Sequence, residues 1–274
     1  MAEAAKKLEG AALTRLLSLV KTHTGITMEE RKRDMLAARI KPRLRVLGLE
    51  SLEDYIDHLE QGKVEVQDFV NLVTTNETHF FRTQAVWDFF QNEYLPEWYK
   101  KNPDTILRIW SAAASTGEEA HSLGMACEEF RFKHPSFKYK VMGSDIDTEV
   151  LAKARSGVFK DRTLDELKSR RPEFVEKYFR EQADGTFRIS PVISANLDFF
   201  QHNLHKAPPK GLMFDIVFLR NVLIYFNDQD QELVLSNMHR ALKPEGMLIL
   251  GESESLARHK TQFNFKKPLI YVKG

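Results

Sequence analysis

The sequence lacks the features of several protein classes. Cys127 is the only cysteine among 274 residues, which excludes intramolecular disulfides and fits a reducing cytoplasm. No stretch of about 18 consecutive apolar residues occurs, so no transmembrane helix is expected. The first twenty residues lack a small-residue cleavage site after a compact apolar stretch, which predicts a helix of the mature protein and not a signal peptide. We therefore expect a cytoplasmic protein without membrane insertion. The helical pattern around Cys127 predicts a buried structural thiol.

Charge and ligand patterns exclude further classes. The formal net charge is only +1, which disfavours a dedicated nucleic-acid binder. No cluster of cysteines, or of histidines with carboxylates, has metal-ligand spacing, so no metal site is expected. The pattern G-x-G-x-x-G is missing after the first predicted strand, which argues against a nicotinamide dehydrogenase. Internal repeats and low-complexity tracts are also absent. The remaining composition is that of a globular protein of one large or two modest domains.

The first ~75 residues are predicted to form short helices. Leu36, Ile40, Leu44 and Leu47 recur at helical spacing within one segment, and Pro42 in that segment predicts a kink or a break because it lacks a backbone donor. A similar apolar stripe precedes them, formed by Leu13, Leu16, Leu17 and Val20. The motif Ser51-Leu52-Glu53-Asp54 predicts an N-cap with an acid three residues on, followed by a helix through Tyr55 and Leu59. We assign residues 1–72 to a helical domain and 73–100 to a linker and helix.

Charge is distributed unevenly within the helical domain. Residues 28–47 contain seven basic and three acidic side chains, whereas residues 51–68 contain six acidic and one basic. In the basic segment Arg43 borders the apolar stripe, while the other cations point away from it, namely Arg39, Lys41 and Arg45. These residues form either a solvated face or a binding surface for an acidic partner.

From about residue 103 apolar strand-like runs alternate with helical stretches. Strands are expected at 106–112, 139–146, 214–219 and 247–250, and a last pair within 263–272. The intervening helices are expected at 118–133, 148–155 and 229–242. This alternation predicts a doubly wound α/β domain over residues 101–274 with a mostly parallel sheet. Residues ~158–200 interrupt it, and strand-like pieces at 187–189 and 192–193, punctuated by Asp184-Gly185 and Pro191, suggest a small antiparallel β insertion.

Ligands of open α/β sheets bind beyond the carboxyl ends of the strands, so the residues that follow each strand are candidates for a site. After the first strand, Ser111-Ala112-Ala113-Ala114-Ser115-Thr116-Gly117 allows a ligand to approach the backbone, and Glu118 and Glu119 begin a helix. Carboxylates there disfavour a phosphate and suit a ligand that carries a positive amino group and a sulfonium. Alternatively, both acids only complement the helix dipole.

Three further segments hold candidate site residues. After the second strand, Asp145 is favoured to accept hydrogen bonds from a ribose diol, while Asp147 lies nearer the helix start as a cap. The alternative is that both only cap or turn the chain. After strand 214–219, Arg220 and Asn221 begin either a site or a solvent loop. Before the α/β domain, the segment Thr74–Arg82 mixes polar and aromatic groups, which indicates either a site or a capped helix that packs two phenylalanines.

Taken together, the stretches TTNETHFFR, WSAAASTGEEA, GSDID and FLRNVLIYF, and the later LKPEGMLILGESES, resemble the CheR family of chemotaxis receptor glutamate methyltransferases over essentially the whole chain. The resemblance implies an all-α N-terminal domain, a linker and a class I methyltransferase domain with a β-subdomain. It implies S-adenosylmethionine as cofactor, with Asn203 and Leu204 near the adenine. It also implies that Arg82 and Tyr225 are catalytic residues close to the transferred methyl group. The implied cofactor-binding residues are Asn76, Thr78, Arg82, Glu118, Asp145, Asn203, Leu204, Arg220 and Asn221.

The resemblance also implies the reaction and the partner. The methyl group goes to glutamate side chains on the cytoplasmic methylation helices of bacterial chemoreceptors, for sensory adaptation, and the expected receptor contacts are Arg39, Lys41, Arg43 and Arg45. Because a glutamate side chain with a pKa of about 4.3 is already an anion at neutral pH, no general base is needed, which fits the lack of an evident one. Family members that tether a receptor peptide carry a glycine-rich loop in the β-subdomain. The turn 182–186 holds only Gly185, so we do not expect tethering. We expect a monomer.

Two other functions compete with receptor methylation. One is a methyltransferase that acts on another substrate: Asn221 to Tyr225 is loosely similar to the Asn-Pro-Pro-Tyr motif of amino-methylating DNA enzymes, but both prolines and the basic excess are missing. The other is a catalytically silent S-adenosylmethionine-binding regulator on the same scaffold. The presence of Arg82 and Tyr225 argues against lost catalysis.

Overall fold

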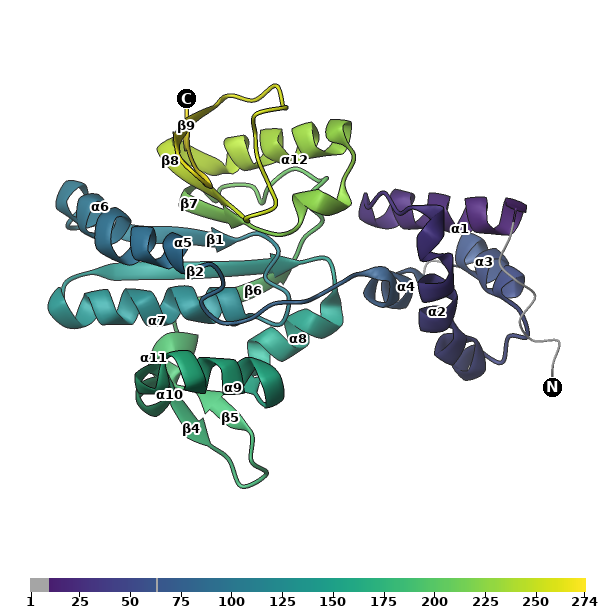
Figure 1. The fold of residues 1–274 in the computed structure, drawn as a ribbon, viewed down its shortest axis with the longest axis horizontal. Coiled ribbons are helices and arrows are strands. Elements are labelled where there is room, and N and C mark those ends of the chain that lie inside the picture. Colours follow the sequence, from purple (N-terminus) through teal and green to yellow (C-terminus); the bar gives the residue numbers. More distant parts are fainter. Residues whose placement is uncertain (1–9, 63) are drawn as a thin grey trace.

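A computed structural model describes residues 10–62 and 64–274, which form a helical part and a sheet part joined by an extended linker (Figure 1). The described portion of the predicted N-terminal helix is α1 (Gly10–Thr24), and residues 1–9 lie outside the described residues. The remaining elements of the helical part are η1 (Glu30–Lys32), α2 (Arg33–Leu47), α3 (Leu52–Gln61) and α4 (Val66–Val73). None of the helices in these two described ranges is long and apolar enough to cross a membrane.

The apolar stripes of α1 and α2 meet α3 and α4 in one small core, which contains Leu16, Ile40 and Phe69 fully buried. Helix α2 continues through Pro42, so of the predicted kink or break, the break is wrong. Pro42 lies on the exposed side of the helix, and the packing of the opposite, apolar side outweighs the single backbone hydrogen bond that proline removes. The predicted cap of α3 is confirmed as a full capping box, because the side chains of Ser51 and Asp54 each accept a hydrogen bond from the other residue's backbone N–H.

The opposite charges of the helical part neutralise one another across helices. Arg43 of α2 donates to both carboxylate oxygens of Glu65 at 2.7 Å and also pairs with Asp68. Tyr55 donates to Glu65 at 2.9 Å. Burial disfavours the Glu65 carboxylate, but the bonds from Arg43 and Tyr55 outweigh it and lower the pKa of Glu65. One predicted receptor contact, Arg43, is therefore part of the internal scaffold of this domain.

The sheet part is built on seven strands in the order β6-β2-β1-β7-β8-β10-β9. Every neighbouring pair is parallel except the two that involve β10, so the predicted doubly wound, mostly parallel fold is confirmed. The strands are β1 (Ile106–Ser111), β2 (Lys138–Asp145), β6 (Leu197–Gln201), β7 (Phe214–Leu219), β8 (Leu242–Leu250), β9 (Phe263–Lys267) and β10 (Ile270–Lys273). The helices and turns around them are α5 (Gln84–Phe89), η2 (Phe90–Tyr94), α6 (Leu95–Lys101), α7 (Glu118–Lys133), α8 (Thr148–Ser156), η3 (Leu223–Tyr225) and α12 (Asp228–Ala241).

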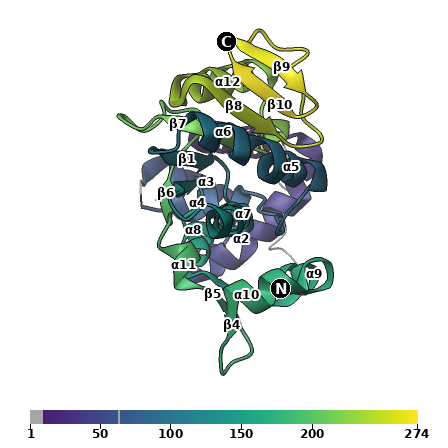
Figure 2. The same cartoon turned by 90° about the vertical axis from the view of Figure 1, so that its left-hand side faces the viewer.

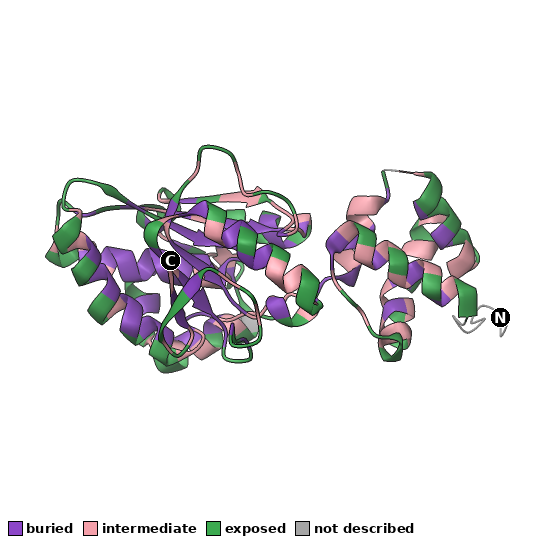
Figure 3. Cartoon of the chain, turned by 90° about the horizontal axis from the view of Figure 1, so that it is seen from above, coloured by how far each residue is buried: buried purple, intermediate pink, exposed green. Residues whose placement is uncertain are grey.

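The strands of the sheet are largely buried (Figure 3). Alternate strand residues enter two different cores, one on each face of the sheet. In β1, Ile109 packs on the side of α5, α6 and α7, whereas Trp110 packs on the side of α12. In β7, Phe218 and Val217 divide in the same way. This two-sided burial explains why FDIVFL reads as a continuous apolar run instead of an alternating one.

The predicted antiparallel insertion lies between α8 and β6 and projects from one end of the sheet domain (Figure 2). Its three strands pair in the order β3-β5-β4 and are accompanied by three helices. Two details differ from expectation: residues 192–193 lie in a helix instead of a strand, and residues 197–201 belong to the main sheet. The elements are β3 (Val158–Phe159), α9 (Asp161–Arg170), α10 (Pro172–Tyr178), β4 (Phe179–Glu181), β5 (Phe187–Ile189) and α11 (Pro191–Ser194).

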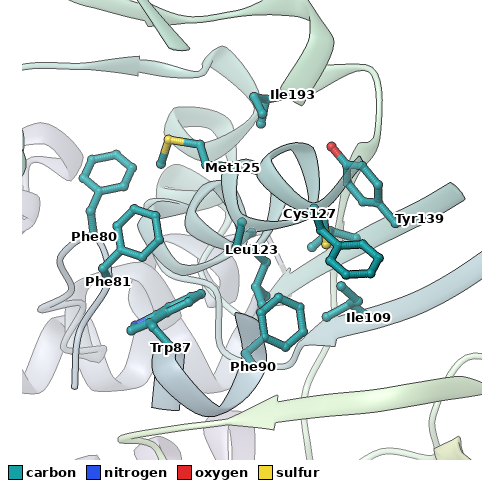
Figure 4. Close-up of a cluster of buried hydrophobic side chains, with 14 of the residues drawn as sticks. Phe80, Phe81, Trp87, Phe90, Ile109, Leu123, Met125, Cys127, Tyr139 and Ile193 are labelled. Carbon is teal, nitrogen blue, oxygen red and sulfur yellow. The ribbon is translucent and has the colours of Figure 1, made fainter. Parts of the chain in front are cut away.

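The linker is anchored in the core against α7. Phe80 and Phe81 are 4% and 5% exposed and point into the cluster that contains Trp87 and Cys127 (Figure 4). Phe81 meets Trp87 edge to face at 4.9 Å. The buried thiol of Cys127 confirms the structural assignment, and burial raises its pKa well above the usual value. The anchored phenylalanines fix the position of the residue that follows them, Arg82.

Stability should depend on pH through His121 of α7. Its ring is buried between Phe159 and Phe199, Nδ1 lies 2.7 Å from the carbonyl of Gly117, and burial lowers its pKa to about 4. In the unfolded chain the ring binds a proton near pH 6.5, whereas in the native state it binds one only near pH 4. The native state therefore loses stability relative to the unfolded chain as the pH falls between these values. The loss amounts to at most about 3 kcal/mol.

His121→Gln removes this titration, so its free energy of unfolding should fall less steeply than that of the parent protein between pH 6.5 and 4. Chemical denaturation across this range measures the slopes. His58→Gln, which removes an exposed histidine of α3, is the control and should follow the parent curve. Parallel curves for His121→Gln and the parent would contradict the assignment.

Candidate active site

A cleft opens at the carboxyl ends of the parallel strands, where the strand order reverses between β1 and β7. It contains about 900 Å³ free of protein atoms, part of it open to solvent. Its walls come from the segments after β1, β2, β6 and β7 and from the linker. This is the position at which open α/β sheets bind ligands, and the size suits a cofactor.

Nine of the ten residues that the sequence suggested for catalysis or cofactor binding line this one cleft. They come from four separated segments of the chain, which the fold brings together. The nine are Asn76, Thr78, Arg82, Asp145, Asn203, Leu204, Arg220, Asn221 and Tyr225. The exception is Glu118.

The two acids that begin α7 have different surroundings. Glu118 is 3% exposed, accepts a hydrogen bond from Thr116 Oγ1 at 2.6 Å and does not line the cleft, and burial raises its pKa. Glu119 does line the cleft and accepts from Ser111 Oγ at 2.8 Å. Successive helix residues point about 100° apart, so only one of the two can face the ligand. The sequence motif could not tell which.

Asp145 and Asp147 divide the two roles that were considered for them. Asp147 caps α8, accepting from the backbone N–H of Glu149 and Val150, which confirms the expected cap. Its other oxygen accepts from the linker side chains of Thr74 and Asn76, at 2.9 and 2.7 Å.

Asp145, in contrast, faces the cleft and is 9% exposed. Its two oxygens accept one backbone N–H each, from Ser115 and Asp147. Burial raises the pKa of Asp145, partly countered by these bonds. Each oxygen keeps a lone pair, so Asp145 can still accept hydrogen bonds from a ligand.

Arg220 joins three parts of the site. Its Nη1 lies 2.9 Å from the Glu119 carboxylate and its Nη2 donates to the carbonyl of Arg82 at 2.9 Å. The side chain is only 2% exposed, so Arg220 does not begin a solvent loop. It cross-links β7, α7 and the linker, and Trp87 Nε1 donates to the same Arg82 carbonyl.

Backbone strain is concentrated around the cleft. Phe81 and Thr83, which flank Arg82, have φ of 50° and 67°; Ser115 and Asn221 have φ of 48° and 58°. Left-handed conformations of such residues cost of order 1–3 kcal/mol each and occur where surrounding structure enforces them. Here they turn the chain sharply at or next to residues that line the cleft, such as Arg82 and Asn221. The backbone therefore sets the direction in which the side chains of these residues leave the chain.

The helical part forms one wall of the cleft, which sequence reasoning missed. Thr24 and Ile26 line it. Asn203 Nδ2 donates to the carbonyl of His23 at 3.2 Å, and the N–H of Thr27 donates to the carbonyl of Tyr225 at 2.9 Å. These contacts join residues about 180 and 200 positions apart, and no local pattern signals them.

Two histidines also line the cleft, although the sequence offered no evident base. Burial, reinforced by the positive charge of Arg82, lowers the pKa of His79; burial lowers that of His202. Both are therefore neutral at pH 7. Within the described part of the chain, no group of three or more His, Cys, Asp or Glu could hold a metal ion.

The four cations suggested as receptor contacts lie on α2 and do not line the cleft. Arg39 donates to the carbonyls of Thr74 and Leu72 at 2.6 and 3.2 Å, so it holds the start of the linker. Arg43 is paired inside the helical part. Lys41 and Arg45 are exposed, and neither has an ion-pair partner among the described residues. Only these two remain free to meet a partner.

Two family models match the chain. One described as CheR methyltransferase, all-alpha domain, matches residues 11–74, and one described as CheR methyltransferase, SAM binding domain, matches residues 76–272. The chemotaxis protein methyltransferases of Salmonella typhimurium and Escherichia coli are 36% and 35% identical over 97% of this chain and 91% of theirs. That of Borreliella burgdorferi is 29% identical over 96% of this chain and 94% of its own. The similarity thus covers both the helical and the sheet part.

Removing the Arg220 side chain should destabilise the fold as well as the site. Arg220→Met leaves the largely buried Glu119 carboxylate unpaired, and we expect a loss of about 3 kcal/mol in the free energy of unfolding. Glu119→Gln in the same chain should recover part of it, which a double-mutant cycle by chemical denaturation measures. As a control, Lys140→Met breaks the more exposed pair with Asp198 and should cost less than about 1 kcal/mol. Equal losses in the two cases would refute the cross-link.

Proposed function

The chain belongs to the CheR methyltransferase family and is an S-adenosylmethionine-dependent methyltransferase, and on that premise we propose that it methylates glutamate side chains of bacterial chemoreceptors in the cytoplasm. The relatives that carry the name chemotaxis protein methyltransferase support a role in chemotaxis. The observation that carries the proposal is that Arg82 and Tyr225 line the same cleft as the acids suited to the cofactor.

The chemistry of the cleft fits this cofactor. Asp145 would accept hydrogen bonds from the ribose hydroxyls, and Glu119, in place of the originally suggested Glu118, would lie near the positive end of the ligand. The two acids in the first turn of α7 disfavour a phosphate there, which argues against a nucleotide diphosphate. Asn203 and Leu204, at the helical-domain wall, would meet the adenine.

The acceptor would be a glutamate carboxylate, an anion at neutral pH. When bound, S-adenosylmethionine supplies a methyl group on a sulfonium sulfur, which a carboxylate oxygen can take with loss of S-adenosylhomocysteine and without any proton transfer. Burial, helped by the charge of Glu77, raises the pKa of Tyr225, so its hydroxyl stays protonated and can donate. A tight ion pair with Arg82 would stabilise the ground state more than the transition state. Arg82 and Tyr225 therefore act by orienting the acceptor and excluding water.

The receptor would approach across α2. Lys41 and Arg45 are exposed and unpaired among the residues the structure describes, which suits a helix that carries glutamates. Arg39 and Arg43, engaged inside the protein, are better explained as scaffold. The methylation helices of chemoreceptors are the proposed partner, and the charge pattern favours contact through two cations and not four.

Methyl transfer to receptors is the direct test. With labelled S-adenosylmethionine, we expect base-labile label on chemoreceptors in isolated membranes, because methyl esters hydrolyse in base. Asp145→Asn should lose most of this label through weaker cofactor binding, whereas Asp198→Asn, an exposed acid of β6, should retain it. Label found only on DNA or small molecules would indicate another substrate. Binding of S-adenosylhomocysteine in calorimetry without label on any acceptor would indicate a silent regulator.

A carboxylate acceptor predicts that His79 of the cleft is dispensable for turnover and that Tyr225 is not. His79→Gln should keep turnover within about threefold of the parent, since no proton is removed. Tyr225→Phe should lower kcat about tenfold or more, the expected loss for an orienting hydrogen bond, and leave affinity for S-adenosylhomocysteine nearly unchanged. Receptor methylation kinetics and calorimetry measure both. Loss of turnover in His79→Gln, with a normal cofactor affinity, would contradict a base-free reaction.

A further inference from the structure

Glu254, in the turn after β8, is a buried acid that the reaction as described does not use. It is 7% exposed, and its carboxylate accepts four backbone hydrogen bonds. Oε1 accepts from the N–H of Val222 and of Leu223, both at 2.8 Å. Oε2 accepts from the N–H of Asn221 at 2.9 Å and of Gly251 at 2.7 Å.

Three of these donors belong to one short segment that leaves β7 and carries two site residues. Asn221 begins it, and the turn η3 at its end contains Tyr225. The first N–H groups of such a turn have no partner within it, and no side chain of the segment itself caps η3. Glu254 supplies the missing acceptor from the turn after β8, so one carboxylate holds three successive N–H groups that lead into η3.

The backbone of the two segments approaches closely at Gly251. A Cβ at Gly251 would lie 2.8 Å from the Asn221 nitrogen and 2.9 Å from Glu254 Oε2, so only glycine allows the two strand ends to approach. Asn221 has φ of 58°, a left-handed conformation that asparagine adopts more readily than most residues and that neighbouring bonds can hold. The bond from its N–H to Glu254 does so.

We propose that Glu254 is a positioning residue for methyl transfer, which acts by holding Asn221 toward the cofactor and Tyr225 toward the acceptor. This inference rests on the proposed function for the roles of those two residues. A carboxylate is required because it is an acceptor on both oxygens. An amide would turn one of them into a donor that faces two N–H groups.

The test compares two glutamates that lie two positions apart in the sequence. Glu254→Gln keeps the shape of the side chain but opposes two backbone donors, and we expect it to weaken binding of S-adenosylhomocysteine and to lower kcat, each about tenfold or more. Glu252→Gln, an exposed acid of the same turn, is the matched control and should change neither. Calorimetry and receptor methylation give the two values, and thermal melting reports the folded fraction.

A double-mutant cycle separates positioning from general destabilisation. If Glu254 acts through Asn221, adding Glu254→Gln to Asn221→Ala should weaken S-adenosylhomocysteine binding by less than twofold further. If Glu254 only stabilises the fold, one of two results is expected. Either the affinity of the folded double variant falls by the product of the two single losses, or Glu254→Gln lowers the melting temperature and leaves the affinity normal. Either of these results would overturn the inference.

Should Glu254→Gln fail to fold, Glu254→Asp keeps the charge but is too short to reach all four donors. It should fold and show the same two losses in smaller degree, and normal affinity and kcat in this variant would overturn the inference. The calorimetric arm needs no acceptor. A parent protein that binds S-adenosylhomocysteine but methylates no receptor would therefore refute the proposed function alone. The role of Glu254 would then still be tested by the double-mutant cycle with Asn221, which measures binding of S-adenosylhomocysteine.

Discussion

The buried contact of Arg220 with Glu119 and with the carbonyl of Arg82 is the interaction on which the geometry of the cleft depends. It joins the end of β7, the start of α7 and the linker. A buried guanidinium is costly without partners, and among the described residues only Nη1 and Nη2 of Arg220 have them, while Nε has none. Loss of either bond would leave a further donor unpaired, so the three segments hold one another in position.

Around this contact, carboxylates repeatedly organise backbone near the cleft. Asp147 ties the linker to α8, Asp145 ties the loop after β1 to the end of β2, and Glu254 ties the ends of β7 and β8. Each bond crosses between chain segments that lie far apart in sequence. A rigid frame of this kind holds side chains in place before a ligand arrives, which lowers the entropy cost of ordering them.

Local pattern was enough to predict most of the elements. The helix at 118–133 and the strand at 214–219 have the expected bounds, because apolar periodicity and buried runs depend on neighbouring residues. The pattern failed where tertiary packing decides. Pro42 lies on the exposed side of a helix whose opposite side packs into the core of the helical part. Residues 192–193 form part of a short helix in which Ile193 is buried against α7.

The order of the motifs along the chain, with acids and small residues after the strands, determined the fold class and the family, and nine of the ten site residues suggested from the sequence line the cleft. Only the tertiary structure decided that Glu119 and not Glu118 faces it, that Thr24 and Ile26 close one wall, and that Arg39 and Arg43 serve the interior. The physical reason is that a sequence motif records residue type and spacing. The direction of a side chain and its partner are set by contacts between segments that the chain brings together only when folded.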